Sequence, residues 1–342
     1  MLHIGKSGDI IAVYFDKGLF ELSKMVSVII PAYNRQAYIQ ECLESVLSQS
    51  YENFEIIIVD DGSSDQTAEI CRNMAKQDSR IQLYAGEHKG VSAARNMALE
   101  KALGEYLFFL DSDDIIHPRL LEVLVGGMEE SGAKIGGTMC FSVKNEVWDR
   151  YKPKFIDQSE VQSYDCVSFE DALETTFSRK TPISMIGGVM FSRDWVGATK
   201  FRTDLTIGED FWFIYENLTK GTSVVYLKSW LYLSRLHQQN SSWDYKYSGF
   251  MTRFLRKELV WKNEEKCGRQ INADRQKSEV LGTYLRCLKR NRVYSKDCKM
   301  MRKTMRKHQK TLLKAMNIRK KIAFLAVVYL PFTGAIINKR IK

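Results

Sequence analysis

Residues 106–114 read Tyr-Leu-Phe-Phe-Leu-Asp-Ser-Asp-Asp. The apolar and aromatic run predicts a strand that is buried on both faces, as in a parallel sheet. The three carboxylates then lie at the carboxyl edge of the sheet, where open α/β sheets bind their ligands. Because neighbouring carboxylates repel one another unless a cation joins them, the cluster favours a Mg²⁺ or Mn²⁺ site shared with a diphosphate. The alternative is a turn with an aspartate helix cap ahead of Pro118.

Two earlier segments also place polar residues directly after an apolar strand. Residues 54–65 read Phe-Glu-Ile-Ile-Ile-Val-Asp-Asp-Gly-Ser-Ser-Asp, and residues 26–34 read Val-Ser-Val-Ile-Ile-Pro-Ala-Tyr-Asn. Gly62 permits a tight turn before the next helix. Three such strand ends in order strengthen the prediction of a binding edge, although Asp, Asn and Gly are also the ordinary residues of βα loops.

The pattern alternates strand and helix from Val26 to about Phe141. Besides the three strands above, we expect helices at 38–49, 66–77, 91–103 and 118–131, and strands at 81–84 and 134–141. This alternation predicts an α/β fold with a mostly parallel sheet flanked by helices.

The second half of the chain is less regular. We expect a variable loop region at 142–180 with a helix near 168–177, a strand at 187–191, a helix from about 207 that opens with Glu209 and Asp210, and short strands at 222–228 and 229–236. The predicted organisation is an N-terminal extension at 1–24, one domain at 25–245 and a basic helical tail at 246–342.

The charge is divided between the body and the tail. Residues 251–342 hold 26 Lys and Arg against 6 Asp and Glu, a charge of +20, and the other 250 residues hold 25 against 35, a charge of −10. A basic tail suits an anionic membrane surface or nucleic acid. The seven cysteines are scattered, without a CxxC pair, which predicts reduced thiols in the cytosol and argues against a zinc site. We find no pattern of a secretory signal peptide.

The tail ends with an apolar segment. Residues 322–337 form a 16-residue uncharged run between Arg319-Lys320-Lys321 and Lys339-Arg340. A spanning helix needs roughly 20 apolar residues, and Pro331 interrupts the run, so an interfacial or re-entrant anchor fits better. The alternative is a core helix that covers the domain. Nucleic acid would explain the charge but not the apolar run.

Four motifs follow one another along the chain: 26–34, 58–65, Gly90-Val91-Ser92-Ala93-Ala94-Arg95-Asn96 and 104–114. Together they resemble a family 2 glycosyltransferase of the bacterial surface-polysaccharide type, with weaker similarity at Gly208-Glu209-Asp210 and Arg235-Leu236-His237. The resemblance covers roughly residues 25–245. It implies a GT-A fold, a nucleotide-sugar donor, by default UDP-linked, a divalent metal (Mn²⁺ or Mg²⁺), and inversion at the anomeric carbon.

The resemblance also assigns residues of the nucleoside pocket. Pro31, Ala32 and Tyr33 would line it, and Asp61, together with Asp60, would accept a hydrogen bond from the base.

The remaining assignments concern the sugar diphosphate. Asp111-Ser112-Asp113 matches the family's DXD motif, in which Asp113 would hold the metal, and Asp111 would contact the donor and is a second candidate ligand. Asp210 would be the general base, since a single displacement needs a carboxylate opposite the leaving group. His237 is a further candidate metal ligand, although Asn240 stands where a Ser is usual and a structural histidine is the alternative. Arg95 would reach a phosphate or pair with a carboxylate of the cluster.

We therefore expect a metal-dependent inverting glycosyltransferase at the inner face of the cell membrane, with a lipid-linked or polysaccharide acceptor and no nucleic-acid partner. A haloacid-dehalogenase-like phosphohydrolase also carries Asp-x-Asp after a strand, but Ile115 departs from its motif and the strand is fourth in order. A dinucleotide enzyme would need a Gly-rich turn after the first strand. The non-enzyme alternative is a catalytically silent membrane-surface scaffold of the same fold.

Overall fold

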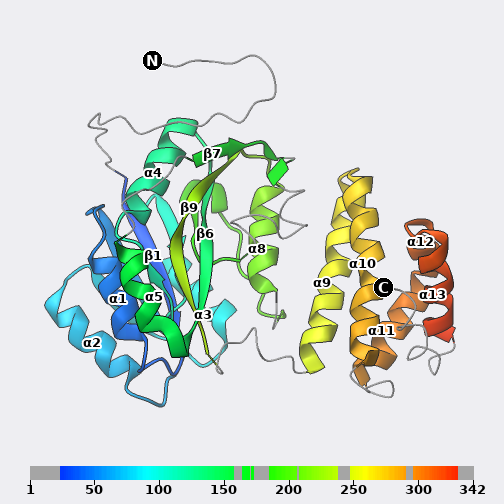
Figure 1. Cartoon of the computed structure of the whole chain (residues 1–342), viewed down its shortest axis with the longest axis horizontal. Helices are drawn as coiled ribbons and strands as arrows, with labels where there is room; N and C mark the ends of the chain where they lie inside the picture. Colours follow the sequence, from blue (N-terminus) through cyan, green and yellow to red (C-terminus); the bar gives the residue numbers. More distant parts are fainter. Residues whose placement is uncertain are drawn as a thin grey trace. The chain divides into compact units, whose positions relative to one another are not determined.

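The computed structural model describes residues 24–157, 164–169, 171–172, 185–205, 208–237, 247–289 and 296–329 (Figure 1). The first half comprises β1 (Val26–Ala32), α1 (Ile39–Leu47), β2 (Phe54–Asp60), α2 (Thr67–Gln77), β3 (Ile81–Ala85), α3 (Val91–Lys101), β4 (Tyr106–Phe109), β5 (Ile115–Ile116), α4 (Leu120–Ser131) and β6 (Ile135–Lys144). There follow a 3₁₀ turn (Asn145–Val147), α5 (Trp148–Ile156), β7 (Tyr164–Val167), β8 (Val189–Ser192), α7 (Arg193–Val196), α8 (Glu209–Leu218) and β9 (Val224–Leu236).

These strands form one nine-stranded sheet in the order β3-β2-β1-β4-β8-β6-β9-β5, with β7 paired to β9. The strands β3, β2, β1 and β4 are parallel, so their carboxyl ends share one edge. The register sets Ala32 opposite Asp60 and Ile29 opposite Phe109. The predicted α/β fold with its parallel sheet is confirmed, and β8 adds antiparallel pairs with β4 and β6.

Helices cover both faces of the parallel strands. Val28 and Ile30 pack into a cluster with residues of α1, α2 and α4, whereas Ile29 packs into a second cluster with α3 and α8. Because side chains alternate along a strand, a strand covered on both faces must be apolar at successive positions. Burial of both faces therefore explains the unbroken apolar runs in the sequence of these strands.

Two predictions for the second half need correction. The segment 142–180 is not simply a loop region, because β6 continues to Lys144 and α5 and β7 follow; most of the helix expected at 168–177 lies outside the described residues. The two strands expected at 222–228 and 229–236 are one 13-residue strand, β9. Its parallel pairing with β6 shifts register around Met139, which lies opposite Trp230, so β9 bends there without ending.

The described residues divide into two compact units, one with the sheet and one with the C-terminal helices. The second unit comprises α9 (Tyr247–Lys266), α10 (Gln270–Lys289), α11 (Lys296–Lys307), α12 (Gln309–Lys314) and α13 (Ile318–Tyr329). Its own core includes Phe254, Trp261, Tyr284, Met301 and Phe324. The domain boundary expected at 245 falls outside the described residues and stays a prediction.

The two ends of the chain fall mostly outside the described part. This holds for the expected extension 1–24, apart from Lys24, and for residues 330–342. Within the described ranges, no helix is both long and apolar enough to cross a membrane.

Candidate functional site

The ends of β1 and β2 are joined to the loop that follows β3. Asp61 donates its backbone N–H to the carbonyl of Ala32 at 2.8 Å. Its buried carboxylate accepts the backbone N–H groups of Lys89 and Gly90 at 3.0 and 2.7 Å. A Cβ on Gly86 would lie 2.9 Å from the Cα of Asp61, so this close approach requires glycine. The carboxylate of Asp61 thus anchors the loop 86–90 against the sheet edge.

Two aromatic rings lie beside this anchor. Tyr33 directly follows β1, is 42% exposed, and its ring centroid is 4.6 Å from that of His88. The Nδ1 of His88 lies 3.0 Å from the carbonyl oxygen of Asp61, and since a carbonyl only accepts, Nδ1 carries the hydrogen in this contact. A cavity of ≈ 250 Å³ opens nearby, lined in part by Asp61, Lys89 and Asn96. An exposed ring next to a buried carboxylate suits a nucleoside base.

Asp60 closes the turn after β2. Its carboxylate accepts the hydroxyl of Ser63, whose Oγ in turn accepts the backbone N–H of Asn34 at 2.8 Å. Asn34 has a positive φ of 52° and accepts the backbone N–H of Ser64 at 2.8 Å. These bonds hold the first two strand ends in a fixed arrangement.

Arg95 links the acidic turn after β4 to α8. Its guanidinium donates to Asp111 Oδ1 at 2.9 Å and to Glu209 Oε1 at 3.2 Å. The side chain is only 5% exposed, and its Nε has no hydrogen-bond partner within the described part of the chain. Burial lowers the pKa of Arg95, but the charges of Asp111, Glu209 and Asp210 outweigh this and raise it. The guanidinium therefore stays charged and draws Asp111 and α8 together.

Glu209 and Asp210 form the first turn of α8. Burial and the neighbouring charge of Asp210 raise the pKa of Glu209 to about 7, against the opposing effect of Arg95. Asp210 is half-buried, and its Oδ1 accepts the backbone N–H of Phe211 at 2.6 Å. The charge of Asp210 also contributes to raising the pKa of Asp111, which burial raises most. The acidic pair thus lies within electrostatic reach of the strand end.

Asp113 points to a different set of side chains. Its Oδ2 lies 2.8 Å from the Nε2 of His237 and 3.4 Å from the Nε of Arg35. The ring of His237 is stacked on Tyr38, with centroids 4.7 Å apart. This buried carboxylate is therefore held next to cationic or proton-bearing nitrogen groups, with which a metal ion would compete for the same oxygen.

Asp114 is a structural carboxylate. It accepts the hydroxyl of Tyr232 and the backbone N–H of Arg235, each at 2.7 Å. Burial, with added repulsion from Asp113 and Asp111, raises its pKa well above the usual range. The hydroxyl of Tyr232 also accepts the backbone N–H of Asp111 at 3.2 Å. Asp114 and Tyr232 thereby fasten the acidic turn to β9.

Arg235 completes this attachment. Its guanidinium lies 3.7 Å from the ring centroid of Trp148 and 4.9 Å from that of Tyr38. It donates to the carboxylate of Glu41 and, through Nε, to the carbonyl of Asp113 at 3.3 Å. Because His237 is two residues further along, this buried arginine also fixes where the imidazole lies.

The acidic residues and His237 have the chemistry of a divalent-metal site. Carboxylate oxygens and an imidazole suit Mn²⁺, and carboxylates suit Mg²⁺. Within the described part of the chain, no three acidic, histidine or cysteine side chains converge on one point as metal ligands. A metal shared with a diphosphate needs only one or two carboxylates from the protein. Asp113, a buried carboxylate at the strand end, fits that requirement, although the guanidinium of Arg35 beside it would compete with the metal for its Oδ2.

The sequence predictions are distributed over this edge. Ala32 and Asp61, Arg95 and Asp111, and Asp113 and His237 are brought into contact or close to it. Pro31 lies within β1, Tyr33 directly follows this strand, Asp60 is the last residue of β2, and Asp210 is the second residue of α8. The sequence did not single out the following contact residues: Arg35, Tyr38, Glu41, His88, Trp148 and Tyr232. It placed Asp114 in the acidic cluster without giving it a separate role. Arg35 directly follows the stretch 26–34 and Tyr38 comes three residues later. Their closeness to that motif is the sequence feature that could have marked them as site residues.

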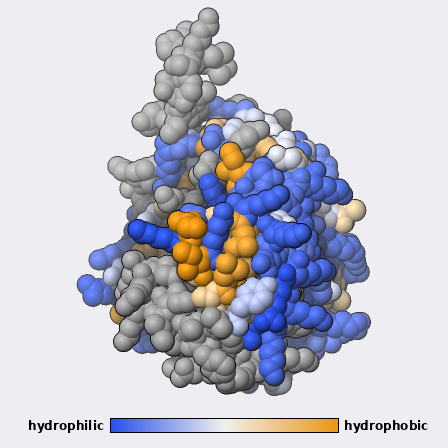
Figure 2. Space-filling model, turned by 90° about the vertical axis from the view of Figure 1, so that its right-hand side faces the viewer, coloured by the Kyte–Doolittle hydropathy of each residue, from blue (hydrophilic) through white to orange (hydrophobic). Residues whose placement is uncertain are grey.

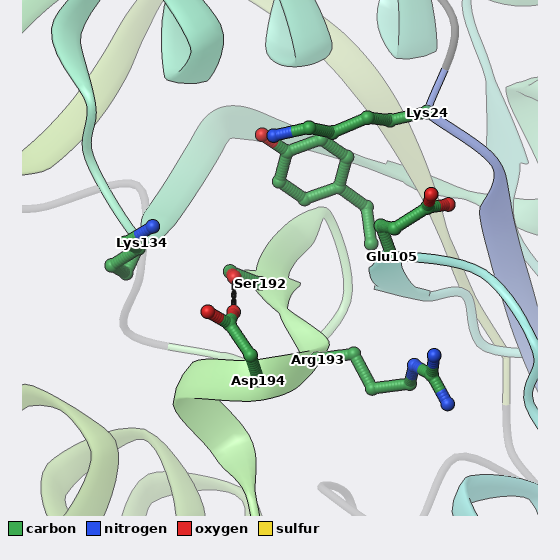
Figure 3. Close-up of a pocket in the computed structure, with 7 residues that line it drawn as sticks. Lys24, Glu105, Lys134, Ser192, Arg193 and Asp194 are labelled. Atoms are coloured by element: carbon green, nitrogen blue, oxygen red, sulfur yellow. Dashed lines mark hydrogen bonds between the residues drawn. The ribbon is translucent and has the colours of Figure 1, made fainter.

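A second pocket of ≈ 280 Å³ lies by the first residues of β4, away from these strand ends (Figure 3). Lys24, Glu105, Lys134 and Asp194 are among the residues that line it, and the hydroxyl of Ser192 donates to Asp194. Its acids and bases are mixed, and Lys24 is paired with Glu129 at 2.7 Å. It lacks the strand-end acids, so we place the candidate site at the opposite edge of the sheet.

Comparison with known proteins gives consistent matches. The family model of glycosyl transferase family 2 matches residues 27–197. The chain is 32% identical over 216 residues to the putative glycosyltransferase EpsH of Bacillus subtilis, covering 62% of this chain and 61% of EpsH. It is 32% identical over 218 residues to glycosyltransferase GlyA of Streptococcus pneumoniae, covering 64% of this chain and 31% of GlyA. The chain thus spans less than two thirds of these curated relatives.

Solved structures share the fold. S. aureus TarS 1-349, crystallised with UDP-GlcNAc, aligns with a TM-score of 0.62 and 18% identity over 92% of this chain and 88% of that one. The mannosyltransferase PcManGT from Pyrobaculum calidifontis, in complex with GDP-Man and Mn²⁺, aligns with a TM-score of 0.51 and 16% identity over 92% of this chain and 91% of that one. The fold that the sequence resemblance implied is confirmed.

Proposed function

The chain belongs to glycosyl transferase family 2, and on this premise we propose the reaction that it catalyses. It moves one sugar from a nucleotide-sugar donor to an acceptor hydroxyl, with inversion and with help from a divalent metal. The observation that carries the proposal is the convergence of Asp61, Asp111 and Asp113 on one edge of the parallel sheet, with Glu209 and Asp210 on the helix that Arg95 attaches to it.

The nucleoside binds at the ends of β1 and β2. Pro31, Ala32 and Tyr33 line its pocket, with the exposed ring of Tyr33 available for contact with the base. Asp61, supported by Asp60, accepts a base N–H; its carboxylate retains lone pairs beyond those used by the loop 86–90. We take a UDP-linked donor as the default, since TarS was crystallised with UDP-GlcNAc, whereas PcManGT was crystallised with GDP-Man.

The donor diphosphate binds next to the acidic turn. Asp113 would hold the metal, with Asp111 and His237 as further candidate ligands. A bound Mn²⁺ or Mg²⁺ would neutralise the negative charge that develops on the leaving diphosphate. Asp111, oriented by Arg95, contacts the donor sugar or ribose. Arg95 is also a candidate for a phosphate contact through its Nε–H, which has no partner among the described residues.

Asp210 removes the proton from the acceptor hydroxyl. It is the second residue of α8, its charge acts on Asp111, and it is less enclosed by partners than Glu209, whose carboxylate is bound to Arg95. A positioned base contributes on the order of 10²–10⁴-fold to the rate. Glu209 therefore positions Arg95 and Asp210, while Asp210 does the chemistry.

The acceptor is a lipid-linked or polysaccharide precursor at the inner face of the cell membrane. The support is the charge of the C-terminal segment, 26 basic against 6 acidic residues in 251–342, which complements an anionic membrane surface. The non-enzyme alternative remains a membrane scaffold of the same fold.

Donor hydrolysis tests the proposal. Purified protein is incubated with a panel of nucleotide sugars in the presence of Mn²⁺, Mg²⁺ or EDTA, and nucleoside diphosphate release is measured. We expect slow release from one donor that EDTA and Asp113→Ala both abolish. Absence of release, together with absence of UDP or GDP binding by calorimetry with metal present, would favour the scaffold.

A further inference from the structure

Helix α13 has two apolar faces. Ala323, Phe324 and Val328 are buried in the core of the C-terminal unit. A second row of large apolar side chains lies outside that core and is exposed: Ile318 (70%), Ile322 (63%), Leu325 (40%) and Tyr329 (47%). Their spacing of four, three and four residues places them along one side of the helix. The buried face packs within the C-terminal unit, and the interfacial anchor expected from the sequence stays a prediction.

This outer row lies in strongly basic surroundings. Residues 296–329 contain eleven Lys and Arg and one acidic residue, Asp297. At the end of the row, the guanidinium of Arg306 lies 5.0 Å from the ring centroid of Tyr329 and donates to the carbonyl of Val328 at 3.0 Å. Figure 2 shows a hydrophobic patch over the C-terminal helices, with hydrophilic residues along part of its border.

We propose that the outer face of α13, formed by Ile318, Ile322, Leu325 and Tyr329, docks on an anionic phospholipid bilayer with the helix axis parallel to the membrane plane. The proposal deepens the proposed function, on which it rests for the membrane location of the acceptor. The 12-residue helix is about 18 Å long, too short to span a bilayer but long enough to bury an apolar row at the level of the headgroups.

Charge and apolarity together select this partner. The anionic headgroups of a bilayer attract the lysines and arginines around the row, and the apolar side chains of the row are buried at the boundary between headgroups and acyl chains. Nucleic acid would use the charge and leave the apolar row in water. The uncharged sequence 330–337 directly follows Tyr329, so the chain beyond the helix is also compatible with the apolar side of the interface.

Vesicle co-sedimentation of the full-length protein tests the proposal. The probes are vesicles of phosphatidylcholine alone and vesicles that also contain phosphatidylglycerol. We expect binding to the anionic vesicles, weakened by added salt, and a loss of at least about tenfold in Ile322→Ser/Leu325→Ser, which removes two apolar contacts with the bilayer. The matched control is Ile271→Ser on α10, an 81% exposed isoleucine outside the row, which should bind as the unaltered protein does.

The possible results separate the two proposals. Equal binding of the double variant and the unaltered protein overturns the docking surface, as does equal binding to neutral and anionic vesicles. A third result would be self-association without vesicle binding: the molecular mass of the unaltered protein in solution rises with protein concentration, and that of the double variant does not. This result would assign the row to contact between copies of the chain and would also overturn the docking surface. Titration of the same variants with UDP or GDP and Mn²⁺ should be unchanged; failure of the unaltered protein to bind either nucleotide counts against the proposed function alone.

Discussion

The Nε of Arg35 lies 3.4 Å from the Oδ2 of Asp113, the same oxygen that the imidazole of His237 contacts. The carboxylate proposed to hold a metal is thus already beside a fixed positive charge. In the absence of donor, this guanidinium opposes the entry of a cation, and once a diphosphate is present it becomes an additional positive group next to the phosphates.

Replacing Arg35 with Gln should therefore change metal and nucleotide affinities in opposite directions. We expect Mn²⁺ alone to bind roughly twofold to fivefold more tightly, since the pair is partly exposed, and the nucleoside diphosphate with Mn²⁺ to bind more weakly. Calorimetric titration measures both. Arg80→Gln is the control, because Arg80 pairs with Asp78 in the turn between α2 and β3. A parallel fall in both affinities would contradict the expected competition.

Gly86→Ala should weaken nucleotide binding. The new Cβ would lie 2.9 Å from both the Cα and the Oδ1 of Asp61, so the loop 86–90 must move away from the carboxylate that anchors it. We expect a loss of about 1–3 kcal/mol in stability or affinity, as for other overpacked sites. Gly104→Ala creates a similar clash, 2.6 Å from the carbonyl of Met25, at the other end of the strands. That control should lower the melting temperature and leave nucleotide affinity intact, and equal affinity loss in both variants would argue against a local effect.

Asp210→Asn separates chemistry from binding. The amide keeps the size of the side chain and its bond to the N–H of Phe211 but cannot take a proton. We expect kcat to fall on the order of 10²–10⁴-fold while the donor dissociation constant changes little. The measurement is steady-state transfer, once an acceptor is known, alongside calorimetry with the nucleotide. If the variant kept full kcat, Asp210 would not be the general base, and another group would have to remove the proton.

Glu209→Gln should alter the pH dependence of stability. Because burial raises the pKa of Glu209 to about 7 in the folded state, the fold favours the protonated carboxyl. Its contribution to the free energy of unfolding is therefore fully present below about pH 4.5 and declines as pH rises toward 7, by roughly 3 kcal/mol at most. The variant lacks this decline, so its stability relative to the unaltered protein should improve from pH 4.5 to 7. Denaturant unfolding at several pH values, without metal, checks this, and parallel pH profiles would refute it.

The parallel half of the sheet was predictable because its cause is local. Strands covered on both faces must be apolar at every position, and the acids that follow them are visible in the sequence as breaks in those runs. The sequence has no comparable pattern that identifies the partners of these acids. Arg95 and Glu209 are 114 positions apart, and Asp113 and His237 are 124 apart, so only the chain's return through β9 and α8 brings them together.

The second half was less readable for a related reason. The irregular pairing between β6 and β9 at Met139 and Trp230 interrupts the period of two that marks a strand, and the sequence reading divided β9 at that point. Asp114 was not distinguished from Asp111 and Asp113, although the structure directs the three side chains to Tyr232, Arg95 and His237 respectively.

The unbroken course of β9 has a consequence for engineering. Tyr232 and Arg235 lie on this strand and His237 directly follows it, so one hydrogen-bonded register with β6 sets the position of all three against the acidic turn. A hybrid enzyme that exchanges the C-terminal region with a homologue should therefore be joined after His237. A junction within β9 that shifts the register by one residue would turn Tyr232 to the other face of the sheet, away from Asp114. The acidic turn would then lose its attachment to β9.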